Sequence, residues 1–297
     1  MRHTLPLKYI DAVARTRSIR AAAEQLSITA SALNRRILAM EEELGVELFE
    51  RHSSGVRMNA AGEIFVQHVR TQMADLERVR SRIADLKGVR LGHVRIAATR
   101  TVTRYFLPRE IQKYRAEFPG VTFDVRSMHR RDAEEALATN EVDIAVVLEP
   151  VRMAEFQSLL LIQQPLHCVI SGDHPLAKRQ SVGLMEVLQH DLLLSPRGEG
   201  IREKLEGATS AKGLKLVPAV ESNDSSFLEA LAREGGGIAF SIPVGIDGQA
   251  SDGSLVHIPL NARDAVSPFL FVGQERQRAL PVAVGKFVEE LKKVLET

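Results

Sequence analysis

The chain of 297 residues is poor in cysteine and has no long apolar run. Its one thiol, Cys168, excludes an internal disulfide framework and is typical of a protein kept in a reducing cytoplasm. The strand-like segment around it, Leu166–Ser171, predicts a buried and inert thiol. No stretch approaches the ~18 consecutive apolar residues of a membrane span, and residues 1–8 hold too short an apolar run for a signal peptide. We therefore expect a cytoplasmic protein without a membrane partner.

The motifs of common enzymes are missing as well. The sequence has no Gly-x-Ser-x-Gly elbow, no His-Glu-x-x-His pair, no phosphate loop ending in Gly-Lys-Ser/Thr and no second cysteine for a zinc cluster. Gly235–Gly237 follows a predicted helix and precedes a predicted strand, the reverse of a dinucleotide fingerprint. His167 and His174 are interpreted as a strand residue and a turn residue rather than metal ligands. The sequence therefore predicts a protein that is not an enzyme and needs no metal or cofactor, with an enzyme of unknown chemistry as an alternative.

The small net charge of +1 hides a difference between the two ends of the chain. Residues 1–90 contain 15 Lys and Arg against 11 Asp and Glu, whereas residues 91–297 contain 24 against 27. The excess is strongest between Arg15 and Arg36, where five arginines accompany one acid, Glu24. Positive charge gathered in this way favours contact with the phosphates of double-stranded DNA.

The basic segment itself has the pattern of a helix-turn-helix, from Ser18 to Gly45. Ser18 and Thr29 are favoured N-cap residues, and Gly45 is a favoured helix end. The spacing of apolar residues predicts that the second helix buries Ala32, Leu33, Ile37, Met40 and Leu44. A short amphipathic helix that carries Leu7, Ile10, Val13 and Ala14 is predicted to pack under this pair.

The opposite face of the second helix carries groups suited to reading DNA. A major groove admits one α-helix, where Arg binds guanine with two donors and Asn binds adenine in the same way. The candidate contacts of this helix are Thr29, Ser31, Asn34, Arg35 and Arg36. Alternatively, Arg35 and Arg36 are ordinary solvated residues paired with Glu41–Glu43. After Gly45, the turn residues at 53–55 predict a hairpin, or wing, whose Arg51, Ser53 and Arg57 would contact phosphates.

A long helix is predicted next, from Asn59 to Leu86, with apolar residues in a heptad pattern. Gln72 is the only break in about three heptads, which favours a coiled-coil seam between two copies of the chain. The residues assigned to this dimer seam are Phe65, Val69, Leu76, Val79, Ile83 and Leu86.

Beyond Gly92, predicted strands and helices alternate. The first unit has strands at His93–Thr99, Val121–Ser127 and Asp143–Leu148 and helices at Val102–Glu117 and Arg131–Asn140. A second unit has strands near Leu166–Ser171, Leu192–Ser195, Leu216–Glu221 and Gly237–Ser241, after which Pro268–Val272 and the helix Val282–Leu295 return to the first. This order predicts an α/β fold of two lobes, with a mostly parallel sheet in the first unit, and such sheets bind ligands outside the carboxyl ends of their strands.

Four loops at predicted strand ends carry hydroxyls, amides and arginines. Helix N-termini and cations favour an anion, so we expect a small carboxylate between the lobes. The candidate contacts are Thr99, Arg100, Thr101, His129, Arg130, Ser195, Arg197, Asn223 and Ser225. The alternative is that these residues are helix caps and surface arginines, with Arg130 paired to Glu134.

The segment AAEQLSITASALNRRILAMEEELGVELFERHSSGVRMNAAGE closely resembles the winged helix-turn-helix of LysR-type transcriptional regulators. Its Glu41–Gly45 and Leu48–Arg51 runs carry the likeness, and His174–Ala177 is a minor signature of the same family. Relatives usually have Gln, Pro and Ser where this chain has Ala30, Ser31 and Asn34, so its operator sequence need not be theirs.

The resemblance implies a transcription regulator whose operator binding or DNA bending responds to a small effector. It implies a DNA-binding domain over residues 1–59, a linker helix over 60–88 that pairs two subunits, and a periplasmic-binding-protein-like effector domain over 89–297. Within that domain, lobe I is expected at about 91–163 and 267–297, and lobe II at about 164–266. The family also implies a tetramer. An exported solute-binding protein would match the second half of the chain, but the basic helix-turn-helix and the lack of a signal peptide argue against it.

Overall fold

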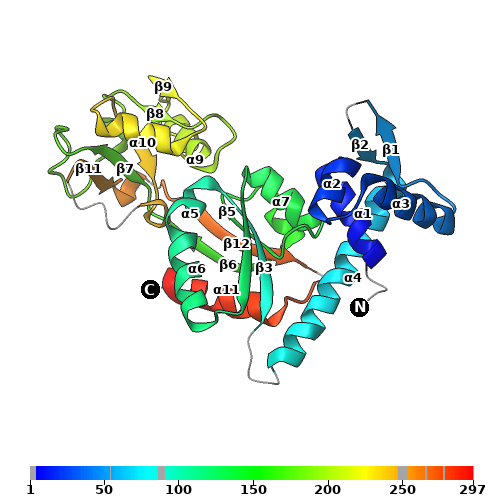
Figure 1. Ribbon diagram of the computed structural model, residues 1–297. Coiled ribbons are helices and arrows are strands. Elements are labelled where there is room, and N and C mark those ends of the chain that lie inside the picture. The colour runs from blue at the N-terminus through cyan, green and yellow to red at the C-terminus, as the bar shows by residue number, and fades with distance from the viewer. Residues whose placement is uncertain are drawn as a thin grey trace. The chain divides into compact units, whose positions relative to one another are not determined.

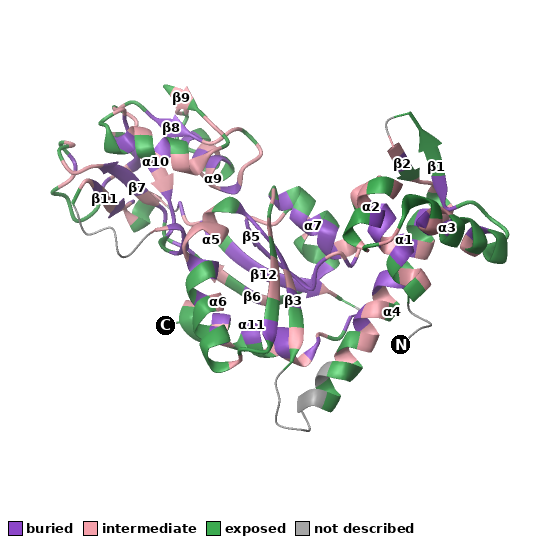
Figure 2. Ribbon diagram, in the orientation of Figure 1, coloured by how far each residue is buried: buried purple, intermediate pink, exposed green. Residues whose placement is uncertain are grey.

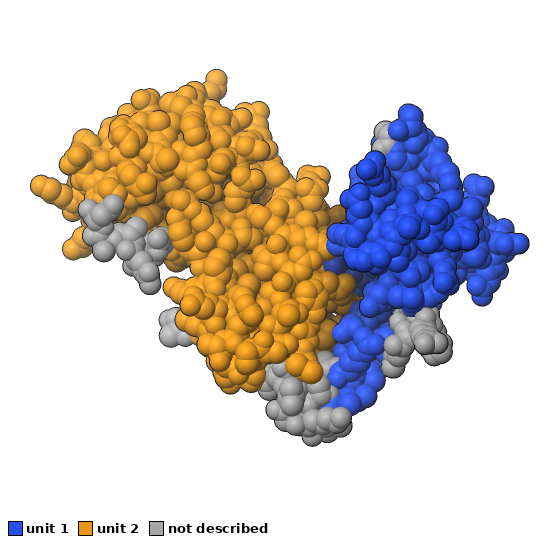
Figure 3. All heavy atoms as spheres, viewed as in Figure 1, with its two compact units in different colours: residues 1–88, 139–141 blue, residues 89–138, 142–297 orange. Residues whose placement is uncertain are grey.

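A computed structural model describes residues 5–53, 55–85, 91–246, 253–264, 266–276 and 278–296. The chain forms two compact units (Figure 3): residues 1–88 with 139–141, and residues 89–138 with 142–297. Among the described residues, the structure has no helix with the length and apolar character to cross a membrane.

The first unit begins with three helices (Figure 1): α1 (Leu5–Thr16), α2 (Ile19–Gln25) and α3 (Ala30–Leu44). Both predicted caps are confirmed, because Ser18 Oγ accepts the Ala21 N–H at 3.3 Å and Thr29 Oγ1 accepts the Ala32 N–H at 3.2 Å. Gly45 ends α3 with φ of +67°, a left-handed conformation that glycine adopts without strain.

The helices enclose a core that includes Ile10, Val13, Leu33 and Ile37. The prediction that Leu44 is buried was wrong, because it is 41% exposed. Met40 is the last residue of α3 that packs against this core, and Leu44 lies one turn beyond it.

The wing consists of β1 (Phe49–His52) and β2 (Gly55–Met58), an antiparallel pair. The buried Glu41 carboxylate fixes its start by accepting the N–H groups of Leu48 at 2.8 Å and Phe49 at 3.2 Å. Gly55 is required at the turn, since its φ is +131° and an added Cβ would lie 2.6 Å from the Arg17 carbonyl oxygen.

Helix α4 (Ala60–Asp85) follows, and the Asn59 side chain caps it by accepting the Gly62 N–H at 2.9 Å. Its predicted dimer seam is only partly available to a partner. Phe65 packs against the helix-turn-helix core, and Val69 is fully buried within the single chain. Assigning Val69 to the seam was therefore wrong, whereas Phe65 is partly buried and Val79 and Ile83 are about half exposed. Leu86 lies outside the described residues.

Lobe I of the second unit is a five-stranded sheet in the order β4-β3-β5-β12-β6. Its strands are β3 (Gly92–Ala98), β4 (Val121–Ser127), β5 (Ile144–Leu148), β6 (Phe156–Gln163) and β12 (Phe269–Glu275). The β3, β4 and β5 strands are parallel as predicted, but β12 runs antiparallel to both β5 and β6. The strand β6 was not predicted, and the sheet is therefore mixed.

Helices cover both faces of this sheet: α5 (Arg100–Arg104), α6 (Phe106–Glu117), α7 (Arg130–Ala138) and α11 (Val282–Leu295). Successive residues of a strand point to opposite faces of the sheet. Ile96 and Val146 pack with α6 and α11 on one face, whereas Ala97 and Val147 pack with α7 on the other. Figure 2 shows burial concentrated in the central strands β5 and β12. The predicted helix at 102–117 is instead two helices that meet at Tyr105.

Lobe II has a smaller, antiparallel sheet in the order β10-β7-β11, formed by Ala239–Ser241, His167–Ser171 and Leu255–Pro259. A parallel pair, β8 (Leu193–Leu194) and β9 (Val220–Glu221), and the helices α8 (Leu184–Val187), α9 (Gly200–Ser210) and α10 (Ser225–Arg233) complete it. Cys168 is fully buried on β7, and burial raises the pKa of its thiol to about 12, which keeps it protonated and unreactive at neutral pH.

Candidate DNA-binding surface and effector pocket

The outer face of α3 presents the predicted DNA-reading residues to solvent. Ser31, Arg35 and Arg36 are exposed. Thr29 caps the helix and its hydroxyl lies 3.2 Å from Ser31 Oγ. Within the described part of the chain neither arginine forms an ion pair, so the alternative pairing with Glu41–Glu43 is not what the structure shows.

The wing and α3 are joined by one side-chain hydrogen bond. An Arg51 guanidinium N–H donates to Asn34 Oδ1 at 2.9 Å. A bidentate contact to adenine uses both the acceptor and the donor of an Asn amide. The bond to Arg51 uses one of the two lone pairs of Asn34 Oδ1, so the Asn34 amide keeps its donors and one acceptor position for a base. Ser53 and Arg57 are exposed on the same wing.

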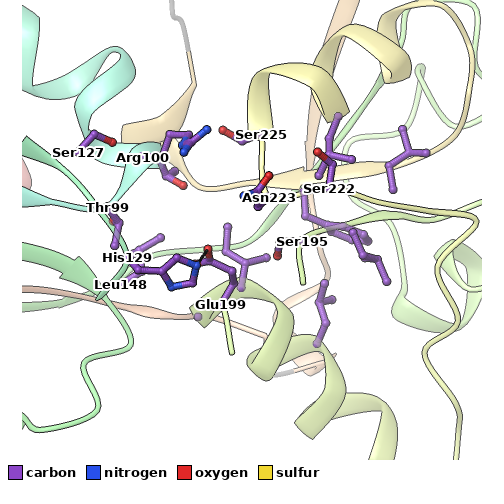
Figure 4. Close-up of a pocket in the computed structure, with 18 of the residues that line it drawn as sticks. Thr99, Arg100, Ser127, His129, Leu148, Ser195, Glu199, Ser222, Asn223 and Ser225 are labelled. Carbon is purple, nitrogen blue, oxygen red and sulfur yellow. Dashed lines mark ion pairs between the residues drawn. The ribbon is translucent and has the colours of Figure 1, made fainter. Parts of the chain in front are cut away.

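In the second unit a cavity of about 120 Å³ lies between the lobes (Figure 4). Seven of the nine predicted effector contacts line it: Thr99, Arg100, Thr101, His129, Ser195, Asn223 and Ser225. The residues that the sequence analysis missed are Ser127, Met128, Leu148, Leu193, Leu194, Glu199, Gly200, Ile201, Leu205, Ser222, Leu228 and Phe240.

The ends of three parallel strands form the lobe I side of this pocket. Thr99 follows β3, Ser127 ends β4 and Leu148 ends β5. Ser127 and Met128 could have been found from the sequence, because they stand at the end of a correctly predicted strand. Glu199, Gly200 and Ile201 belong to the start of α9, a helix that was not predicted.

Thr99 is the most unusual polar residue of the pocket. Its side chain is only 7% exposed, and Oγ1 has no hydrogen-bond partner among the described residues. The backbone of Thr99 is fully used, because its N–H donates to the Val146 carbonyl and its own carbonyl accepts from Val102 and Thr103. A buried hydroxyl without a partner is destabilising, and Thr99 is a residue of the pocket lining.

Two predicted effector contacts were wrong. Arg130 is almost fully buried, donates to the Glu149 carbonyl at 2.5 Å and forms an ion pair with Glu203, away from the pocket lining. Its alternative partner, Glu134, instead accepts the Val151 N–H at 2.6 Å. Arg197 is 81% exposed and lies 3.2 Å from Glu206 on the outside of α9.

Ion pairs join the two lobes on both sides of the pocket. On one side His129 Nε2 lies 2.9 Å from Glu199, Arg130 contacts Glu203, and Lys204 lies 3.2 Å from Glu149. On the other side the ion pairs are Arg104 with Glu229 and, at 3.8 Å, Arg100 with Asp224. Burial raises the pKa of the Glu229 carboxyl, and the nearby Arg104 guanidinium opposes this shift only in part.

A winged helix-turn-helix in one unit and a two-lobed domain with a cavity in the other define a DNA-binding regulator with a ligand-binding domain. Residues 87–296 match the family model of the LysR substrate binding domain, and residues 6–63 match that of the bacterial regulatory helix-turn-helix proteins of the lysR family. The chain belongs to the LysR family of transcription regulators.

Among curated relatives, the RuBisCO operon transcriptional regulator of Allochromatium vinosum is 27% identical over 78% of this chain and 77% of its own length. The regulator CbbR of Rhizobium meliloti is 29% identical over 84% of this chain and 80% of its own. These similarities extend over both units and not only over the helix-turn-helix.

Solved structures share the same fold. A full-length OxyR variant from Pseudomonas aeruginosa aligns with a TM-score of 0.76 and 21% identity, covering 97% of this chain and 94% of that one. Full-length CbnR in complex with its target DNA aligns with a TM-score of 0.64 and 21% identity, covering 98% and 99%.

Proposed function

We propose that a small anionic effector binds between the lobes and controls operator binding or DNA bending by this regulator. The observation that supports it best is Thr99, which belongs to the pocket lining and whose buried hydroxyl lacks a partner among the described residues. Thr101, Asn223 and Ser225 line the same space and would donate to an anion from both lobes. Arg100 adds the positive charge.

The effector acts on lobe closure in this proposal. Thr99 and Thr101 belong to lobe I, whereas Asn223 and Ser225 belong to lobe II, so a ligand that bridges them favours the closed arrangement. It can shift the closed population only to the extent that it binds that state more tightly than the open one.

Double-stranded DNA is the other partner, and CbnR, a structural neighbour solved with its target DNA, supports this assignment. Arg35, Arg36 and Asn34 would contact base edges, with Ser31 and Thr29 beside them. Arg51, Ser53 and Arg57 would contact phosphates. We also propose a homodimer through Leu76, Val79 and Ile83, assembled further into a tetramer that acts in the cytoplasm on the chromosome. Residues 1–59, 60–88 and 89–297 would serve DNA binding, dimerisation and effector binding in turn.

Binding of the full-length protein to DNA selected from a random pool tests the DNA half of the proposal. Arg35→Ala should cost ~1–3 kcal/mol on the selected sequence and relax discrimination at one base position. Arg57→Ala is the matched control from the wing, because loss of a phosphate contact weakens selected and random DNA about equally. Equal losses on both DNAs for Arg35→Ala would contradict its assignment to base reading.

A further inference from the structure

The wing strand β1 is attached to α3 at two points (Figure 1). At the start of the strand, the buried Glu41 carboxylate accepts the N–H groups of Leu48 and Phe49. Two residues beyond Phe49, an Arg51 guanidinium N–H donates to Asn34 Oδ1 at 2.9 Å. Asn34 and Glu41 are separated by two helical turns and therefore lie on the same side of α3. Both contacts with the wing are made from this side of the helix.

The alternation of side chains along β1 brings the Arg51 guanidinium to α3. Phe49 and Arg51 are two residues apart, so they point to the same face of the hairpin. Phe49 packs into the core that the helices enclose, whereas Glu50 and His52, on the other face, lie 3.4 Å from each other. A guanidinium carries several N–H donors, so the bond to Asn34 leaves others free to contact a phosphate.

This bond has a consequence for the orientation of the Asn34 amide. An Asn side chain carries its acceptor oxygen on one side and its N–H₂ donors on the other, and rotation about its last torsion angle is roughly twofold. Half a turn therefore exchanges the donor and the acceptor that face a base. The Arg51 donor favours the orientation seen here, because in the other orientation its N–H would meet the N–H₂ group of Asn34.

Base pairs differ in the order of donors and acceptors that they present in the major groove. An amide held in one orientation distinguishes these patterns, whereas an amide that turns freely matches more than one of them. We infer that Arg51 is a positioning residue that determines the base preference of Asn34, in addition to any phosphate contact of its own. This inference rests on the proposed DNA-binding function of the same surface.

DNA selected from a random pool by the full-length protein tests the inference, together with variants of that DNA in which one base pair is replaced at a time. Fluorescence anisotropy gives the affinity for each. Asn34→Ala identifies the base pair that Asn34 reads, as the position where discrimination is lost. At this position the wild-type protein should prefer the selected base pair by about tenfold or more.

Arg51→Met removes the donors and keeps most of the aliphatic stem of this exposed side chain. It should reduce discrimination at the base pair read by Asn34 about threefold or more and leave discrimination at the other positions unchanged. In the Asn34→Ala background, Arg51→Met should cause no further change at that position. Arg57→Met is the matched control from the same wing, because it should weaken binding to every DNA by about the same factor.

Three results would overturn the inference. If Arg51→Met weakens binding to every DNA equally, as Arg57→Met does, Arg51 contacts phosphates only. Equal loss of discrimination at many positions would mean that Arg51 supports the whole recognition helix, and unchanged discrimination in Asn34→Ala would mean that Asn34 reads no base. Failure of the proposed function has a different result, since the protein would then select no sequence from the pool.

Discussion

The proposed DNA-binding surface and the effector pocket differ in whether their cationic side chains form ion pairs. On α3 and the wing, Arg35, Arg36 and Arg57 are exposed, and among the described residues none of them forms an ion pair. Around the pocket, His129 and Arg130 are each paired with a glutamate of the other lobe.

This difference fits the two partners. DNA is a polyanion that is present in excess and is bound through many phosphates, so basic side chains without an ion-pair partner supply affinity for any sequence. A small ligand makes few contacts and has to be distinguished from similar molecules, which is better done with neutral hydroxyls in a mostly apolar cavity. Cations without a partner in such a cavity would attract every small anion.

The largest effect expected from this comparison is on salt dependence. If the surface makes about 6–10 phosphate contacts, its affinity for selected DNA should fall ~10³–10⁵-fold between 50 and 200 mM salt. Binding of a small monocarboxylate to the pocket should change only about twofold, because one charge is involved and it is partly enclosed. Fluorescence anisotropy and calorimetry over the same salt series measure both. Equal salt dependence would contradict the contrast between free and paired cations.

The next effect concerns assembly. Val79→Lys with Ile83→Lys places like charges in the proposed seam, where they would be desolvated and would face their symmetry mates. The dimer should dissociate, and DNA affinity should fall about 10²-fold or more because the two helix-turn-helix units no longer bind together. Light scattering gives the mass of each variant.

Ile64→Lys serves as the control for this experiment, since Ile64 is 73% exposed on the same helix but was not assigned to the seam. It should keep the mass of the wild-type protein. An unchanged mass in the double variant would instead show that subunits associate elsewhere.

The two regions also differ in how much the sequence could predict. In the helix-turn-helix, the caps Ser18 and Thr29 and the terminator Gly45 act on backbone groups within a few residues, so local chemistry was sufficient. The packing partners of Phe65 and Val69 could not be predicted from local chemistry, because a heptad pattern does not distinguish a partner helix from the core of the same chain.

The pocket depends on segments far apart in the sequence. Residues at the ends of strands could be predicted, as Thr99 and Ser195 show. The partner of a charged side chain could not be predicted. Arg130, for example, contacts Glu203, which lies on an unpredicted helix of the other lobe. Glu199 was missed for the same reason, and with it the contact that joins it to His129 of the other lobe.

The smallest effect expected is on stability, and it tests the hydroxyl that supports the proposed function. In the ligand-free protein Thr99 Oγ1 is buried without a partner among the described residues, so Thr99→Val removes an unsatisfied group. The free energy of unfolding should stay the same or rise by up to ~1 kcal/mol. Thr209→Val is the control, because Thr209 is also buried but its Oγ1 donates to the Leu205 carbonyl at 2.9 Å, and its loss should cost ~1 kcal/mol.

The same Thr99→Val substitution should weaken binding of a monoanion that fits the pocket, by ~1–3 kcal/mol, because the ligand then loses a donor in a buried site. The opposite signs of the two changes are the decisive feature: a hydroxyl kept for the fold would lower stability when removed, and a hydroxyl kept for a ligand would lower only affinity. Urea unfolding of the ligand-free proteins gives the first quantity and calorimetry gives the second. A clear loss of stability in Thr99→Val, comparable to that in Thr209→Val, would mean that the Thr99 hydroxyl serves the fold and that the effector is bound by other residues.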